Sequence, residues 1–169
     1  QFTHQGATLL VNKANQTISF AQDFNGTFLG QDPIDLNATA SSGLPLYYHS
    51  SHPEIAEVNG TQLLIHWVGE VVLTALQDGN ENFLPTTLER SFEIHDVDAP
   101  NITLRGPDEI HLEAGRPYLD EGAEAFDVVD GNLSVAILVD NPVNPEIPGT
   151  YLVKYTVADA RANLAEYLR

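Results

Sequence analysis

Carboxylates are the side chains of this sequence with the clearest capacity for chemistry. Six of them are taken as candidate metal ligands: Asp96, Asp98, Asp127, Asp130, Asp159 and Glu70. Calcium binds about six to eight oxygen atoms, which proteins supply as carboxylates and carbonyls. The spacing of the six residues matches no single-loop calcium motif. The competing interpretation is that Asp130-Gly131 is an ordinary turn and that the other aspartates cap loops.

Other combinations of reactive side chains carry weaker signals. They are the pairs His49 and His52, Glu54 and Glu57, and Asp120 and Glu121. Residues three apart in a strand point to opposite faces, so the two histidines do not form a metal pair, and no third ligand lies near them. The β-sandwich with short loops that the strand pattern below predicts offers no cleft for a sugar ring, so the acidic pairs are better explained as surface charge. We expect no catalytic residue and no enzymatic activity.

The charge balance excludes several classes of partner. Among 169 residues, 24 are acidic and 7 are basic, and the formal net charge is −17. The acidity is spread over both halves of the chain, whereas nucleic acids and anionic membranes select clustered Lys and Arg. No apolar run approaches the roughly 20 residues of a membrane-spanning helix. We therefore expect no nucleic-acid partner, no direct membrane insertion and a monomer, with Ca²⁺ as the one cofactor to consider.

Hydrophobic side chains recur with a period of two, which predicts strands with one buried face. The runs lie at residues 34–40, 63–67, 133–137 and 151–157. The parity of the second run places Trp67 in a core, and this residue is the only Trp of the chain. No stretch keeps a helical period for three turns, so we expect an all-β protein without a long α-helix. Tyr151 follows Pro148-Gly149-Thr150 and resembles a tyrosine corner, in which the hydroxyl bonds to nearby backbone.

A composition change at residues 93–100 predicts a domain boundary, because an acidic stretch and Pro100 separate two strand-like runs. The predicted domains are 1–94 and 95–169, each of a size suited to a seven-strand sandwich. Residues 1–14 are interpreted as a lead-in strand or as the end of a preceding module. The last strand of the second domain is expected to be cut short at Arg169.

Four segments of the first half form a recognisable pattern: QTISF at 16–20, ASSGLPLY at 40–47, SSHPEIAEV at 50–58 and GEVVLTALQDGN at 69–80. In these segments the first half resembles the repeated Ig-like modules of large bacterial secreted and surface proteins. The resemblance covers about residues 15–95. It implies an immunoglobulin-like antiparallel β-sandwich.

Five segments of the second half form another pattern: DAPNITL at 98–104, EAG at 113–115, YLDEGA at 118–123, DVVDGNL at 127–133 and PGTYLVKYTVAD at 148–159. In these segments the second half is similar to another Ig-like module of bacterial surface proteins. The Gly-Asn that usually follows the last Asp is here Ala162-Asn163. If that position has a positive φ, Ala162 strains the loop. The resemblance implies a second sandwich, so the chain is expected to contain two tandem immunoglobulin-like antiparallel β-sandwiches.

The resemblance also implies where the candidate ligands lie. In an Ig-like sandwich the start of the first strand, the BC loop and the FG loop share one pole, which brings the five aspartates together. Glu70, in a turn of the first module, is expected to face the same joint. By analogy with cadherin-like joints, Ca²⁺ bound there would stiffen the connection between the modules.

The resemblance implies a function that is mechanical and not catalytic. The expected role is that of spacer modules of a secreted or cell-surface, adhesin-like protein. The alternative is a carbohydrate- or ligand-binding accessory module of a secreted polysaccharide-degrading enzyme. The expected partners are neighbouring Ig-like modules of the same chain, and a surface glycan or protein reached through distal domains. The expected location is extracellular or at the cell surface.

Overall fold

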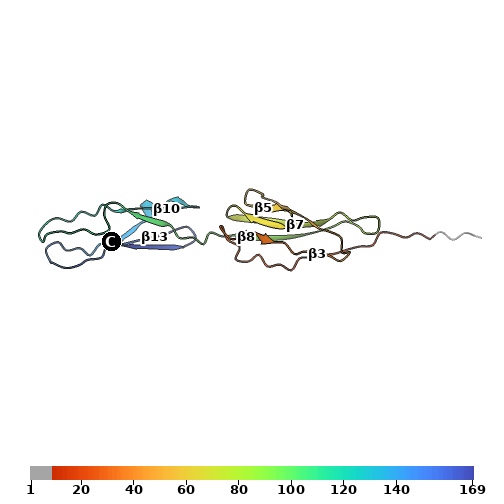
Figure 1. The fold of residues 1–169 in the computed structure, drawn as a ribbon, viewed down its shortest axis with the longest axis horizontal. Helices are drawn as coiled ribbons and strands as arrows, with labels where there is room; N and C mark the ends of the chain where they lie inside the picture. Colours follow the sequence, from red (N-terminus) through yellow and green to blue (C-terminus); the bar gives the residue numbers. More distant parts are fainter. Residues whose placement is uncertain (1–8) are drawn as a thin grey trace, which may run out of the picture. The chain divides into compact units, whose positions relative to one another are not determined.

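The computed structural model describes residues 9–169, and the protein is all-β (Figure 1). All the strands pair antiparallel, and the short 3₁₀ helix η1 (Ser134–Ala136) is the only helix in the described residues. The chain divides between His95 and Asp96 into two compact units. Of the proposed lead-in segment 1–14, residues 1–8 lie outside the described part. Ala14 forms an isolated parallel bridge with Phe83.

The first unit contains eight strands in three small sheets. The strands are β1 (Ile18–Ser19), β2 (Ile34–Asp35), β3 (Thr39–Ala40), β4 (Tyr47–Ser50), β5 (Ala56–Asn59), β6 (Gln62–Ile65), β7 (Gly69–Gln77) and β8 (Thr86–Ile94). The sheets have the orders β1-β3, β2-β6-β5 and β4-β7-β8. Alternate residues of β7 enter the core, so Val71, Leu73 and Ala75 are buried together with Phe20 and Leu63. Phe24 stacks on Phe92 at the edge of this core.

The second unit contains two three-stranded sheets that face one another across a smaller core. The first sheet has the order β11-β10-β9 and the second the order β12-β13-β14. The strands are β9 (Asn101–Leu104), β10 (Ala123–Asp127), β11 (Gly131–Asn132), β12 (Leu138–Asp140), β13 (Lys154–Ala158) and β14 (Leu164–Leu168). Ile102 and Ala125 from the first sheet meet Val153, Tyr155 and Val157 from the second. The alternation of buried and exposed residues along β13 follows the period of two that the sequence predicts.

The outer face of the β12-β13-β14 sheet carries apolar side chains. Leu138, Leu164 and Leu168 are each more than half exposed. The register places them on one face, because they lie opposite Thr156, Ala158 and Lys154 of β13. The Lys154–Glu166 ion pair lies on the same face. We refer to this surface as the leucine face.

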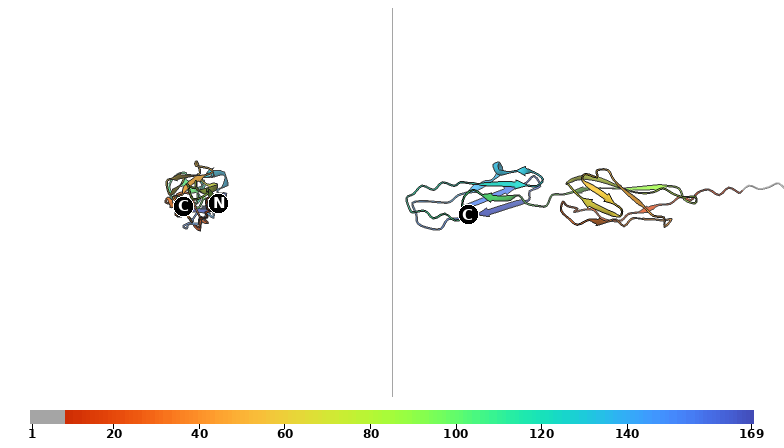
Figure 2. Two further views of the ribbon diagram at one scale, coloured as in Figure 1. Left: turned by 90° about the vertical axis from the view of Figure 1, so that its right-hand side faces the viewer. Right: turned by 45° about the horizontal axis from the view of Figure 1, so that its top comes forward.

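The final strand runs to Leu168, and Figure 2 shows it pointing towards the marked end of the chain. Every residue of β14 pairs with a residue of β13, from Ala158↔Leu164 to Lys154↔Leu168. The backbones of Val153 and Arg169 add a further pair of hydrogen bonds, both 2.9 Å long. All five residues of β14 thus have a partner on β13, and the expectation that this strand is cut short stays a prediction.

Two sequence predictions are wrong at the level of single elements. The run 133–137 does not form a strand, because the N–H of Ser134 bonds to Asn132 Oδ1 and the chain turns into η1, which leaves Val135 fully exposed. Trp67 is not a core residue: its side chain is 42% exposed. Strand β6 ends at Ile65, and the N–H of Trp67 then bonds to the carbonyl of Ile55, so the strand alternation does not reach the indole.

Candidate metal site

Three buried aspartates come together in the second unit, at the end where the chain enters it. One oxygen atom from each of Asp96, Asp127 and Asp159 lies within 4.8 Å of the other two. The three residues are between 4% and 8% exposed. The structure thus assembles three of the predicted ligands into one group, which we call the aspartate cluster.

Local hydrogen bonds fix the two loop aspartates. Asp127 ends β10, and its Oδ1 accepts the N–H groups of Val129 at 2.8 Å and Asp130 at 2.9 Å. Asp159 follows β13, and its Oδ1 accepts the N–H groups of Arg161 and Asn163. Aspartate turns of this kind hold the carboxyl group against its own loop. The loops therefore present preformed carboxylates and need no rearrangement to bring them together.

Asn163 ties the cluster together from within the second unit. Its side-chain N–H₂ donates to Asp159 Oδ2 at 2.7 Å and to the backbone carbonyl of Asp96 at 3.3 Å. The preceding residue, Ala162, has a φ of 67°, and it is the only described residue other than glycine with a positive φ. Left-handed backbone costs an L-residue about 1–2 kcal/mol. The strain predicted for Ala162 is therefore present in the loop that positions Asn163.

Asp96 is the least satisfied member of the cluster. Its Oδ1 accepts the N–H of Asp98 at 3.2 Å, whereas its Oδ2 is buried and has no hydrogen-bond partner among residues 9–169. Burial raises the pKa of the Asp96 carboxyl above its usual value, and the nearby charges of Asp127 and Asp159 raise it further. The Asp98 N–H acts in the opposite direction but does not cancel these effects. The site thus contains a buried carboxylate oxygen that has no hydrogen-bond partner in residues 9–169.

The other predicted ligands lie outside the buried cluster. Asp98 and Asp130 are exposed. Asp130 Oδ2 accepts the N–H of Ala160 at 2.7 Å and so links the loop after β10 to the loop after β13. Glu70 belongs to the first unit, where it is exposed on β7 opposite Glu93.

The donor set of the cluster suits a hard divalent cation. Carboxylate oxygens are preferred by Ca²⁺ and Mg²⁺, whereas zinc and copper sites use His or Cys. Three clustered carboxylates with two exposed aspartates nearby suit the larger and less regular coordination of Ca²⁺ better than the strict octahedron of Mg²⁺.

A second buried polar group was missed by the sequence reasoning. Tyr155 donates its hydroxyl to Asp120 Oδ1 at 2.5 Å, and the same oxygen accepts Nη1 of Arg169 at 2.8 Å. The pairing of β13 with β14 brings Tyr155 and Arg169 together, and Asp120, which precedes β10, contacts both. Asp120, which the sequence indicated as surface charge, is therefore an internal acceptor whose side chain is 15% exposed.

Several smaller predictions can be placed on the structure. Tyr151 donates its hydroxyl to the carbonyl of Ile147 at 2.9 Å, which confirms the tyrosine corner. His52 contacts Ser51 through Nδ1, and Glu57 contacts His66. His52 and Glu57 thus each have a polar partner on the protein surface and need no metal or substrate to account for them.

Residues 102–169 match the family model described as bacterial surface protein, Ig-like domain. No curated protein matches the chain. Within residues 9–169 no helix is long and apolar enough to span a bilayer. The match covers the two facing sheets and two of the three clustered aspartates. Residues 102–169 are thus similar in sequence to the Ig-like domains of bacterial surface proteins.

Proposed function

We propose that the chain is a non-catalytic spacer segment of a bacterial cell-surface, adhesin-like protein, and that Ca²⁺ bound by Asp96, Asp127 and Asp159 holds its second unit together. The observation that supports calcium most directly is the buried Asp96 Oδ2, which has no hydrogen-bond partner in residues 9–169. The surface Ig-like match of residues 102–169 supports the structural role and the location.

The energetics of burial favour a bound cation. A buried carboxylate is costly unless it is paired or protonated. The aspartate cluster holds three such groups within 4.8 Å, and their oxygens accept hydrogen bonds from backbone N–H groups and from the neutral side chain of Asn163. Either a proton or a cation can relieve the repulsion. The preformed loops favour a cation, because the two aspartate turns already orient the carboxylates before binding.

The ion would act by linking three parts of the second unit. Asp96 is its first residue, Asp127 ends β10, and Asp159 follows β13. A cation between them ties the incoming chain to the loops that close both sheets. A tied chain transmits force into the sheets instead of fraying at their edge. This is the property that a spacer between a cell surface and a distal adhesive domain requires, and it is the physical basis for expecting a stiffer connection when calcium is bound.

The test is a melting experiment on the full chain. Thermal unfolding of the second unit is followed in millimolar CaCl₂, in EGTA, and in NaCl of the same ionic strength. A site that binds only the folded state adds about 2.7 kcal/mol at a hundredfold excess of ligand over Kd. We expect Tm to be higher in CaCl₂ than in EGTA or NaCl, and MgCl₂ to raise it less than CaCl₂ does. Equal Tm values in CaCl₂, EGTA and NaCl would show that the cluster binds no calcium.

An exposed Trp67 supports a second candidate function, that of a ligand-binding accessory module. Exposed aromatic rings can serve as platforms for sugars, and the indole is 42% exposed. A glycan-binding screen with the intact chain and the Trp67→Ala variant separates the two functions. A spacer shows no glycan retention in either protein, whereas a carbohydrate module loses retention with the indole.

A further inference from the structure

The sequence contains an excess of the triplet Asn-x-Ser/Thr, in which the middle residue is not proline. This triplet is the acceptor motif for N-glycosylation and belongs on the surface of exported proteins. About one or two copies are expected by chance from the 12 Asn and 19 Ser and Thr residues, but the chain has six. The asparagines of these triplets, all of them exposed, are Asn15, Asn25, Asn37, Asn59, Asn101 and Asn132. Enrichment together with exposure of every copy favours a modification motif over the accidental composition of turns.

Two of these asparagines lie beside one exposed aromatic ring in the second unit. Phe126 of β10 is directly opposite Asn101 of β9 on one side and Asn132 of β11 on the other. Residues directly opposite in an antiparallel pair point to the same face and have Cβ atoms about 4.5–5.5 Å apart. Because the neighbours Ala125 and Asp127 are buried, these three side chains point away from the core. We call the three residues the Asn–Phe–Asn row.

The ring of Phe126 is an apolar surface without a role in the core. Its side chain is 61% exposed, although it lies on the middle strand of its sheet, and the core of the second unit is formed by other side chains. The face of an aromatic ring can pack against the apolar C–H groups of a sugar while the sugar hydroxyls stay in water. A sugar on either neighbouring asparagine begins one side chain away from this ring. The row thus places an apolar platform beside two acceptor amides.

Side-chain contacts join the first and third residues of both triplets. Asn101 Nδ2 donates to Thr103 Oγ1 at 3.5 Å, and Asn132 Oδ1 accepts the N–H of Ser134 at 2.9 Å. The Ser134 hydroxyl in turn accepts the N–H of Ala125 in β10 at 3.0 Å. Both asparagines are therefore held at defined positions on the surface of the sheet.

We propose that Asn101 and Asn132 are N-glycosylation sites and that the attached sugars pack against Phe126. The donor is a sugar activated through a phosphate ester at C1, carried on a nucleotide or on a lipid. In the transfer the asparagine Nδ2 forms a bond to C1, the C1–O bond to phosphate breaks, and the amide gives up one proton to a base of the transferase. The Ser134 hydroxyl is part of the acceptor motif, so transfer at Asn132 takes place before η1 packs on β10. The proposal does not depend on calcium.

The first test examines the protein isolated from the cells that produce it. Mass spectrometry of its peptides should find a sugar on Asn101 and on Asn132. A single hexose would identify the nucleotide-linked donor, whereas an oligosaccharide transferred as a block would identify the lipid-linked donor. Thr103→Val, which keeps the acceptor amide but destroys the triplet, should remove the sugar from Asn101 alone. Absence of sugar from either asparagine of the unmodified protein would overturn the proposal.

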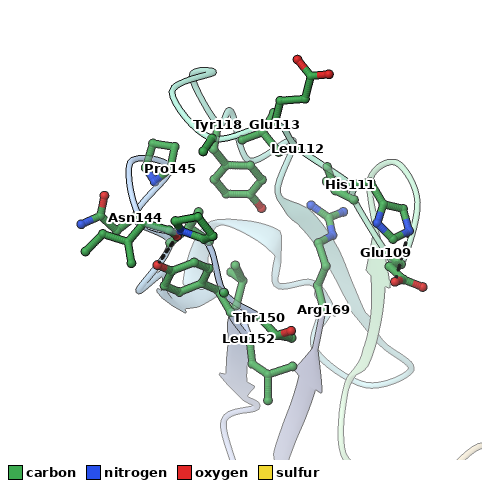
Figure 3. Close-up of a pocket in the computed structure, with 18 of the residues that line it drawn as sticks. Glu109, His111, Leu112, Glu113, Tyr118, Asn144, Pro145, Thr150, Leu152 and Arg169 are labelled. Carbon is green, nitrogen blue, oxygen red and sulfur yellow. Dashed lines mark hydrogen bonds and ion pairs between the residues drawn. The ribbon is translucent and has the colours of Figure 1, made fainter.

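Asn80 and Asn144 are matched controls within the same protein. Both are exposed, and neither has Ser or Thr two positions further on. They form the same kind of side-chain turn as Asn132, because Asn80 Oδ1 accepts the N–H of Asn82 at 2.8 Å and Asn144 Oδ1 accepts that of Glu146 at 3.1 Å. Figure 3 shows Asn144 at the edge of a surface pocket. Both controls should be bare, and sugar on either would show that modification does not follow the motif.

A second test addresses the contact with Phe126. Sugars that cover the ring should raise Tm of the second unit by at least about 4 °C relative to the same chain produced in a host without N-glycosylation. In Phe126→Thr the two sites should stay occupied, but the rise should fall to less than half. Glu124→Thr, an exposed position on the same face of β10, should keep the rise. A rise in Phe126→Thr equal to that of the unmodified protein would overturn the contact with the ring.

Discussion

The substitution Asp96→Asn should have opposite effects on stability with and without calcium. Two unit charges 4.8 Å apart, the upper limit within the aspartate cluster, repel by about 3 kcal/mol at an effective dielectric constant of about 20. Asp96 faces two such neighbours, Asp127 and Asp159. The amide keeps an oxygen for the Asp98 N–H and removes one charge. Even a third of one pairwise repulsion, about 1 kcal/mol, shifts Tm by about 4–8 °C in a domain of this size.

In EGTA the Asp96→Asn variant should therefore melt above the unmodified protein. In CaCl₂ it should melt below it, because a carboxylate ligand has been lost and most of the calcium-induced rise disappears. Calorimetry of both proteins in the two buffers, at matched ionic strength, measures the four Tm values.

Asp140→Asn is the matched control. Asp140 is an exposed carboxylate on β12, so this variant changes the net charge by the same amount without touching the cluster. Its Tm should move little and equally in both buffers. If the two variants shift Tm alike, the cluster behaves as ordinary surface charge and the reasoning fails.

Three further predictions follow from single residues. Ala162→Gly should raise the free energy of unfolding by about 1 kcal/mol, because glycine adopts a φ of 67° without steric cost. Ala160→Gly in the same loop is the control and should lower the free energy of unfolding. Urea titration measures both variants. In EGTA, stability should fall as the pH rises above the ordinary aspartate pKa of about 4, because the raised pKa of Asp96 means that the folded state binds its proton more tightly; Tm that is flat in pH would contradict this. Burial and the contact with Asp120 raise the pKa of Tyr155, so stability should also be lost as the pH rises past about 10, and Tyr155→Phe should show a smaller alkaline loss in the same melts.

The sequence predicts the elements that depend on neighbouring residues. The period of two along 151–157 corresponds to β13 and its inward Tyr155 and Val157, because a paired strand keeps its alternation. The pattern fails where a turn interrupts pairing. At 133–137 the Asn132 side chain accepts the N–H of Ser134, and the backbone turns into a 3₁₀ helix. At Trp67 the pattern fails because strand β6 has already ended at Ile65.

The candidate site was predictable to the extent that it depends on loops sharing one pole. That argument brings Asp127 and Asp159 together, and it holds for Asp96 because this residue begins the second unit. The loop argument does not predict which of the five aspartates are buried. Asp98 and Asp130 are exposed because their side chains do not turn toward the core, and the sequence pattern does not encode that orientation. The Asp120–Tyr155–Arg169 group left no pattern in the sequence, because partners on separate strands have no fixed spacing.

The leucine face has a consequence for how the protein behaves in solution. Leu138, Leu164 and Leu168 would favour contact with another apolar surface, but each molecule carries a net charge of −17. At physiological ionic strength the Debye length is about 8 Å, and in molar salt it falls to about 3 Å. Like-charge repulsion therefore acts as a colloidal barrier that keeps these faces apart in dilute buffer. Concentrated salt screens this repulsion and also strengthens apolar association. The leucine face should therefore not associate at low ionic strength but should favour contact between molecules in molar salt.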